Sequence, residues 1–177
     1  MEYEELKSYL IEKFEAWAYE QRDLYMPNAR PLSDAEQLRL REYFEKRILD
    51  RTRIVSLEEI PNPPFYSDLE ESGIPIPLDL TQAAGFCLID YVLIRKGLWS
   101  HPSAALSTVF HEMVHLVQWD VLGSRRLIEL YTDALLRDGY SQVVFERQAY
   151  RLTDRFVRGG PPFSVRAVVE EEFKGAM

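Results

Sequence analysis

HEMVHLVQW, residues 111–119, is the stretch of sequence that decides how this chain is organised. It ends a run, residues 104–119, that has no lysine or arginine and in which Glu112 is the only acidic residue. A helix that is apolar nearly all round is usually buried. We therefore expect this run to form a central helix of the core.

The same stretch carries the pattern His-Glu-x-x-His. His111 and His115 are four residues apart, so on a helix both imidazoles lie on one face and can reach one metal ion. Zinc suits such a site because it accepts imidazole and carboxylate ligands and lowers the pKa of a bound water to about 7. Glu112 follows His111 on the helix, so it lies beside the metal position without being a ligand. It can then take a proton from the zinc-bound water. The alternative is a pair of hydrogen-bonded core histidines, with Glu112 turned to solvent.

A catalytic zinc needs a third protein ligand, and Glu146 is the candidate that the sequence favours. In the helix expected after Ser141, Glu146 shares a face with Ala149 and Tyr150 and lies away from the arginine-rich side. An acidic residue on an inward face is the pattern that a metal ligand leaves. The alternative for Glu146 is an ordinary surface pair with a neighbouring arginine.

Other residues compete less well for the third ligand position. The arrangement of the metzincin peptidases would require glycine and histidine where this chain has Gln118 and Val121. His101 precedes the motif at the start of the helix, so it could approach the site only if the helix begins unusually late. Cys87 is expected to be a small core residue and not a ligand. The remaining carboxylate rivals are Glu129, Asp133 and Asp154, of which Asp154 could instead accept a hydrogen bond from a ligating histidine.

Hydrophobic spacing and turn signals predict the other elements. In the N-terminal half we expect a helix over Tyr3–Gln21, a helix from Ser33 or Asp34 to Leu49, a strand over Arg53–Leu57, a proline-rich loop over Pro61–Pro77, and over Gly85–Gly97 a strand or two strands meeting near Asp90. In the C-terminal half we expect helices from Ser100 or Ser103 to Gly123, from Ser124 to Gly139, and from Ser141 to a point before Gly159. The tail over Phe163–Met177 is expected to form a short helix or a strand, or to fray. Few strands followed by several helices predict an α+β fold.

Length and composition set wider bounds. The 177 residues match one domain, so we expect residues 1–177 to share a single core. With 21 basic and 29 acidic residues, the net charge of −8 argues against a nucleic-acid partner. A lone cysteine excludes an intramolecular disulfide. No apolar run is long enough for a membrane helix and the N-terminus does not read as a secretory signal, so we expect a cytoplasmic protein with no membrane partner.

HEMVHLVQW together with FERQAY, residues 145–150, resembles the gluzincin metallopeptidases, and among them the minimal single-domain type termed minigluzincins. The resemblance covers residues 86–156. It implies a zincin-like α+β fold in which a small sheet packs on the motif helix and on a glutamate-bearing helix. It implies Zn²⁺ as cofactor, with His111, His115 and Glu146 as ligands and Glu112 as general base. It also implies that the strand ending near Ile94–Arg95 is the edge strand to which a peptide adds.

The expected function is thus that of a zinc-dependent metallopeptidase, a hydrolase that acts on a peptide or protein substrate. The oxyanion of the reaction needs a further donor, for which Tyr140 and Tyr150 are candidates, with Arg147 and His101 behind them. The main alternative is a regulatory or interaction domain that binds zinc without proteolysis. A structural protein without a metal is the third possibility.

Overall fold

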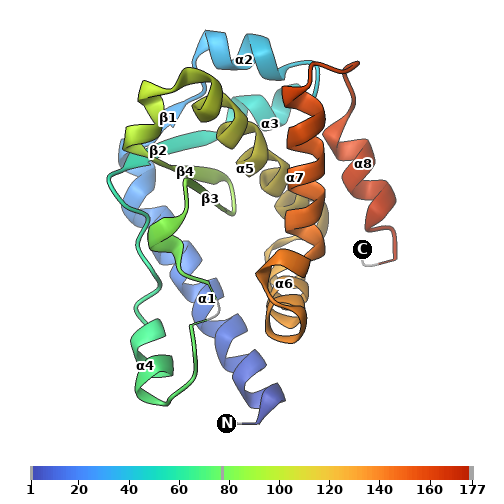
Figure 1. Ribbon diagram of the computed structural model, residues 1–177. Coiled ribbons are helices and arrows are strands. Elements are labelled where there is room, and N and C mark those ends of the chain that lie inside the picture. The colour runs from blue at the N-terminus through green and yellow to red at the C-terminus, as the bar shows by residue number, and fades with distance from the viewer. Residues whose placement is uncertain (1, 77, 176–177) are drawn as a thin grey trace.

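The computed structural model in Figure 1 describes residues 2–76 and 78–175. Within those residues, eight α-helices and one four-stranded sheet form the mixed α+β fold that the sequence predicts. The strands are β1 (Arg30–Pro31), β2 (Arg53–Leu57), β3 (Gly85–Leu88) and β4 (Tyr91–Arg95). The α-helices are α1 (Tyr3–Tyr25), α2 (Asp34–Leu40), α3 (Lys46–Arg51), α4 (Tyr66–Glu71), α5 (Pro102–Leu122), α6 (Ser124–Asp138), α7 (Val144–Val157) and α8 (Val165–Glu172). Short 3-10 turns are η1 (Met26–Asn28), η2 (Leu80–Gln82), η3 (Lys96–Ser100) and η4 (Tyr140–Gln142).

The strand order in the sheet is β1-β2-β4-β3. β4 pairs in parallel with β2 and antiparallel with β3, so that Val92 lies opposite Ile54 on one side and Cys87 on the other. The strand that ends at Ile94–Arg95 is therefore internal, and the prediction that it forms the edge is wrong. Because β2 lies on one side of β4 and β3 on the other, β3 is the edge strand of the sheet at this end, and it packs against α5.

The hairpin that joins β3 to β4 confirms the prediction of two strands meeting near Asp90. Ile89, in the turn, has a positive φ of 55°, a conformation that a β-branched residue adopts rarely. Asp90 beside it forms a bidentate ion pair with Arg22 of α1, with both N···O distances 2.8 Å. The turn is thus tied to the N-terminal helix.

Helix α5 is the centre of the molecule. It packs against β3 and β4 on one side and against α6, α7 and α8 on the others, as Figure 1 shows. Every residue from Glu112 to Trp119 is buried, which confirms the expected central helix. Pro102 occupies its first turn, and Gly123 ends it with a φ of 77°, which favours glycine.

The edge strand β3 lies between α5 and α1. Successive strand residues point to opposite faces. Gly85 faces Thr108 and Glu112 of α5, whereas the ring of Phe86 packs against Phe14 of α1, with ring centroids 6.4 Å apart. The N-terminal helix and the motif helix thus lie on opposite faces of β3, and residues of both line the same cavity.

The predicted single helix from Ser33 or Asp34 to Leu49 is wrong, because the chain breaks between α2 and α3. In the break, the rings of Tyr43 and Phe44 both pack against Phe110 of α5, at 5.5 Å and 5.1 Å between centroids. Packing these two aromatic rings against the core helix outweighs the weak local preference for a continuous helix.

Two other segments differ from the prediction, and the tail adopts one of its expected alternatives. The proline-rich segment from Pro61 contains the short helix α4; its last predicted residue, Pro77, lies outside the described residues. Turn η4 precedes α7, so the glutamate helix begins at Val144 instead of Ser141. The tail forms α8, whose first turn is capped by the hydroxyl of Ser164. Across the described ranges, no helix has the length and apolar character that a bilayer crossing needs.

Candidate metal centre

Three side chains converge where α5 meets α7. The Nε2 atoms of His111 and His115 are 3.2 Å apart. Glu146 of α7 places one carboxylate oxygen 3.4 Å from the Nε2 of His111 and the other 3.4 Å from the Nε2 of His115. One ligand atom from each residue can be chosen so that all lie within 4.8 Å of one another. These three residues form a group that could hold a metal ion.

The spacing of the donor atoms fits a small tetrahedral ion. Ligand atoms about 2.0–2.1 Å from a tetrahedral zinc lie about 3.3 Å from one another. The two Nε2 atoms are separated by 3.2 Å, which matches that edge length, and each lies 3.4 Å from a different oxygen of the Glu146 carboxylate. With a single carboxylate oxygen as the third donor, all three atoms lie within 4.8 Å of one another. Two imidazoles and one carboxylate also form a donor set typical of catalytic zinc, because they leave a fourth position open.

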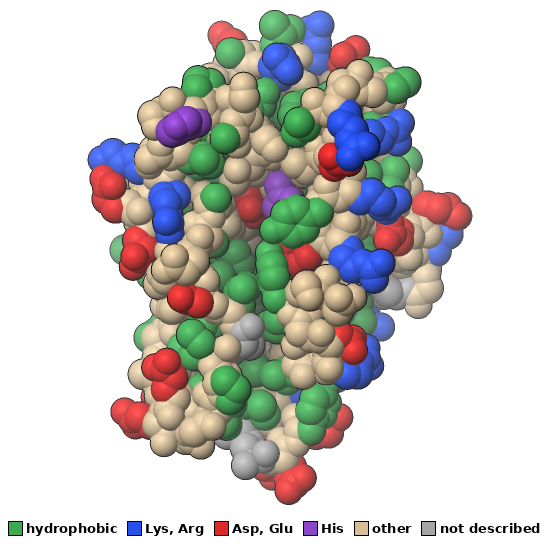
Figure 2. Space-filling view, in the orientation of Figure 1, with side chains coloured by type: hydrophobic (Ala, Val, Ile, Leu, Met, Phe, Trp, Pro, Cys, Tyr) green, Lys and Arg blue, Asp and Glu red, His purple; other side chains and the backbone are tan. Residues whose placement is uncertain are grey.

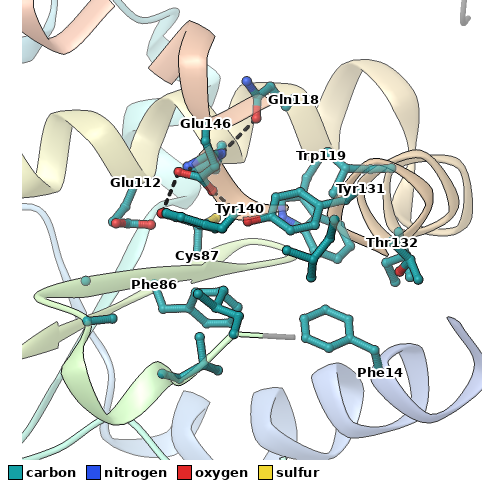
Figure 3. A pocket seen from close by; sticks show the side chains of 18 of the residues that line it. Phe14, Phe86, Cys87, Glu112, Gln118, Trp119, Tyr131, Thr132, Tyr140 and Glu146 are labelled. Atoms are coloured by element: carbon teal, nitrogen blue, oxygen red, sulfur yellow. Dashed lines mark hydrogen bonds and ion pairs between the residues drawn. The ribbon is translucent and has the colours of Figure 1, made fainter. Parts of the chain in front are cut away.

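Two tyrosine hydroxyls hold the carboxylate of Glu146. Tyr131 of α6 donates to its Oε1 at 2.8 Å, and Tyr140 of η4 donates to its Oε2 at 2.9 Å (Figure 3). Each hydroxyl satisfies one carboxylate oxygen of a side chain that is only 8% exposed. The orientation of Glu146 toward the histidines is thus set by α6 and η4 as well as by its own helix.

The electrostatics of the metal-free site follow from this packing. Burial alone would raise the pKa of Glu146, but His115 and His111 outweigh it and hold that pKa well below its usual range. Burial alone would lower the pKa of His115, but Glu146 outweighs it and raises the pKa to about 9. Without a metal, the two groups thus form a buried ion pair, and a bound cation would take the place of the proton.

Glu112 lies beside this group without belonging to it. Burial is the main cause that raises its pKa, and the backbone N–H of Cys87 on β3 donates to its carboxylate. Its side chain passes so close to Gly85 that a β-carbon there would lie 2.9 Å from Cγ and from Oε1 of Glu112. The edge strand thus needs a glycine at this position to admit the carboxylate.

All four motif and ligand side chains line one cavity of about 120 Å³. Its far wall is apolar and comes from α1, α4, the 78–86 segment and α6. Phe14 and Phe86 face the polar end from across this cavity in Figure 3. In the space-filling view of Figure 2, a hollow lined by hydrophobic side chains runs downward from a histidine near the centre of the face. The metal group thus stands at the polar end of an apolar cavity.

The structure leaves the rivals for the third ligand elsewhere. Glu129 pairs with Arg125 and Arg126, Asp133 pairs with Lys7 and Arg137, Asp154 pairs with Arg158, and His101 contacts the hydroxyl of Ser100. Cys87 lines the cavity, but its buried thiol has a raised pKa and is not among the three grouped donors.

The two tyrosines predicted as oxyanion donors occupy different places. Tyr140 is engaged with Glu146, whereas the ring of Tyr150 lies 4.5 Å from the ring of His111 and is 57% exposed. Neither position tests the predicted role, so it stays a prediction. Arg147, the residue suggested behind them, is exposed on α7.

Sequence reasoning missed three residues that shape the site. Tyr131 and Gly85 carry no local signal, because their roles depend on how α6 and β3 pack against the motif helix. Gln118 does carry one, since it lies one turn after His115 in a helix predicted to be buried. Its side-chain oxygen is 2.8 Å from the Nδ1 of His115. A buried amide on the histidine face could have been recognised as a partner of that ring.

Comparison with known proteins adds no family. No family model, curated protein or solved structure matches this chain. The resemblance to gluzincins therefore stays a prediction from the motif. The structure shows a mixed α+β fold with a group of His111, His115 and Glu146 that could hold a metal ion.

Proposed function

We propose that this protein is a zinc-dependent hydrolase of peptide bonds with a zincin-like site. The observation that carries the proposal is the convergence of His111, His115 and Glu146: the two Nε2 atoms are 3.2 Å apart, each lies 3.4 Å from one oxygen of the Glu146 carboxylate, and a buried glutamate lies alongside. Such a cluster in the wall of a cavity supports a catalytic site over a closed structural one, because a structural zinc site uses four protein ligands.

The chain's own residues have separate tasks in this proposal. When bound, the metal supplies a Lewis acid that polarises a carbonyl and makes a coordinated water acidic. Glu112 accepts a proton at its carboxylate and returns it to the leaving amine. Its raised pKa favours this work, because a stronger base accepts the proton more readily. Tyr131 and Tyr140 keep Glu146 in place during these steps.

The cavity and the edge strand support a peptide or protein as substrate. The apolar wall suits a hydrophobic side chain next to the bond that is cut. β3 has no strand on its outer side in the part of the chain that the structure describes. A peptide in extended form could pair with backbone groups on the outer side of β3. The N–H of Cys87 is not among them, because it donates a hydrogen bond to Glu112.

Metal content and a single amide substitution test the proposal. The purified protein should carry about one zinc per chain, and His111→Ala should lose it. Glu112→Gln should keep the zinc and abolish cleavage of a peptide mixture, read by mass spectrometry. Glu129→Gln, a change of the same kind at a glutamate paired with surface arginines, is the matched control and should leave both properties intact.

Each alternative has its own outcome. Zinc that is bound without any cleavage of the peptide mixture by the wild type would favour the non-proteolytic zinc-binding domain. A wild type with no affinity for divalent metals would leave a structural protein. Cleavage that survives Glu112→Gln would mean that the base is another residue. Unchanged zinc affinity in Glu146→Ala would remove the third ligand.

A further inference from the structure

A chain of hydrogen bonds runs from His115 to the C-terminal helix. The Nδ1 of His115 lies 2.8 Å from the Oε1 of Gln118. The Nε2 of Gln118 donates to the Oε1 of Gln148 at 2.9 Å and to the backbone carbonyl of Phe145 at 3.1 Å. The Nε2 of Gln148 then donates to Glu172, the last residue of α8, at 2.8 Å. Both amides are almost fully buried, at 0% and 1% exposed.

The orientation of each amide is set by a neighbouring group that can only accept hydrogen bonds: the Phe145 carbonyl for Gln118 and the Glu172 carboxylate for Gln148. A backbone carbonyl and a carboxylate can only accept, whereas an amide can be turned to offer either its oxygen or its NH₂. Phe145 therefore requires the NH₂ of Gln118, and Glu172 requires the NH₂ of Gln148. The oxygen of Gln118 is left to face His115. The ring nitrogen it meets must then carry a hydrogen, since two acceptors would repel each other.

We propose that Gln118, Gln148 and Glu172 are positioning residues that keep a proton on the Nδ1 of His115 and leave its Nε2 to the metal. The inference rests on the proposed metal site, but it adds a role for α8, a helix with no residue in the cluster. The orientation of a ligand on α5 is set through α7 by a carboxylate 57 residues further along the chain.

Packing supports the same route. The ring of Phe173, one residue after Glu172, stacks on Phe145 with centroids 4.8 Å apart, and it is Phe145 whose carbonyl holds Gln118. Arg151 holds the carboxylate of Glu172 in place. Its guanidinium lies 2.5 Å from the same oxygen of Glu172 that accepts the hydrogen bond from Gln148. Docking of α8 and metal binding should therefore favour each other, and the effect should be reciprocal.

An exchange of amide and carboxylate tests the relay. Gln148→Glu puts two carboxylates face to face and should lower zinc affinity by about 10-fold, within the range for outer-shell partners of a metal ligand. Adding Glu172→Gln restores one acceptor and one donor with the atoms exchanged, and the double variant should return to within about 2-fold of the wild type. A competition assay with a chromophoric chelator measures the affinity. Equal affinities in the single and double variants would overturn the relay.

A matched control separates the relay from the general stability of α8. Glu171 neighbours Glu172 but pairs only with Lys174 in the described structure. Glu172→Leu should weaken zinc binding several-fold and remove hydrogen-exchange protection that zinc adds to α8. Glu171→Leu should do neither. If both variants behaved alike, the role of Glu172 would be structural and the proposal would be wrong.

A direct observation of the ring distinguishes failure of this inference from failure of the proposed metal site. With ¹⁵N-labelled histidine, NMR should show a slowly exchanging Nδ1–H on His115 in both the metal-free and the zinc-loaded protein. Gln118→Leu should lose that protection. A wild type that binds no zinc but shows this proton would sink the metal proposal and keep the positioning role. A wild type that binds zinc through Nδ1 would sink the positioning role alone.

Discussion

The carboxylate of Glu112 can occupy its position only because Gly85 has no side chain. The carboxylate lies against the backbone of the edge strand and accepts the N–H of Cys87. A β-carbon at position 85 would also lie 2.7 Å from the Cγ2 of Thr108, so neither side of the contact has room for it. The position of the proposed base thus depends on a residue with no chemistry of its own.

Gly85→Ala should therefore separate catalysis from metal binding. The added methyl group has to displace Glu112, and a shift near 1 Å can cost about 100-fold in rate. We expect kcat/KM on a peptide substrate to fall by at least about 10-fold while zinc affinity changes little, because Glu112 is not among the three grouped donors. Gly97→Ala is the control, since a β-carbon there meets nothing within 4 Å. Full activity in Gly85→Ala would contradict this account.

The pairing of His115 with Glu146 makes zinc binding depend on pH. Glu146 raises the pKa of His115 to about 9, so below that pH the ring of the metal-free protein holds a proton that zinc must displace. The logarithm of the zinc association constant should rise by about one per pH unit from pH 6.5 and level off above pH 9. In Glu146→Gln the binding should be weaker and should level off at lower pH. Calorimetry in buffers of different ionisation enthalpy measures the released proton.

Among single residues, the sequence predicted the grouped donors better than their surroundings. His111 and His115 are close because a helix places positions four apart on one face, which is a local rule. Glu146 joins them, although the face assigned to its helix is only partly correct, since Tyr150 is exposed and Phe145 is buried. The tyrosine and glycine contacts depend on how separate elements pack, and no local spacing encodes that.

At the scale of elements, α5 is joined to α3 and α8 by one carboxylate. Asp120, 11% exposed in its side chain, accepts from Arg47 at 2.5 Å, from Arg51 at 2.7 Å and from Arg166 of α8. Burial alone would raise the pKa of Asp120, but Arg47 and Arg166 outweigh it and hold the pKa below its usual value. The junction fixes the helix that carries the motif against two others.

Asp120→Asn should destabilise the fold in a pH-dependent way. Because the pKa of Asp120 is lower in the folded state, its contribution is complete above the unfolded pKa near 4 and is lost as pH falls through the folded value. We expect a loss of about 1–3 kcal/mol at pH 7, and a difference from the wild type that shrinks below about pH 4. Urea unfolding at several pH values measures it. Asp154→Asn, which removes an exposed pair, should cost within about 0.5 kcal/mol.

The elements themselves were predicted where local signals act alone. The strand Arg53–Leu57, expected from its β-branched residues, and the hairpin around Asp90, expected within a glycine-bounded stretch, both form. The helix expected up to Leu49 failed because Tyr43 and Phe44 bind a helix that is distant in sequence. Propensity gives no information about such a partner.

At the scale of the whole molecule, a metal should stabilise the fold. All three donors come from packed helices that meet only in the folded chain, so an ion that binds there favours the folded state. Zinc at about 1,000 times its Kd should add about 4 kcal/mol, or roughly 10 °C in Tm for a chain of this size. Calorimetry with and without chelator measures the shift. His115→Ala should show none, and Mg²⁺, which prefers oxygen ligands, should not replace zinc.

The overall arrangement was the part least accessible from sequence. The parallel pairing of β2 with β4 joins segments more than thirty residues apart, and the α1 wall of the cavity comes from residues about a hundred positions before the motif. Periodicity assigns an apolar face to each of these elements without naming its neighbour. The α+β class followed from the order of elements, whereas the strand order and the cavity depend on contacts between segments distant in sequence.

The small exposure of the three donors has a kinetic consequence. The side chains of His111, His115 and Glu146 are only 8–12% exposed. A chelator could therefore approach a bound ion only from the cavity, so the rate of its removal would be set by access through that cavity. Residence time, more than equilibrium occupancy, would then govern whether the protein keeps its ion through dilution and dialysis.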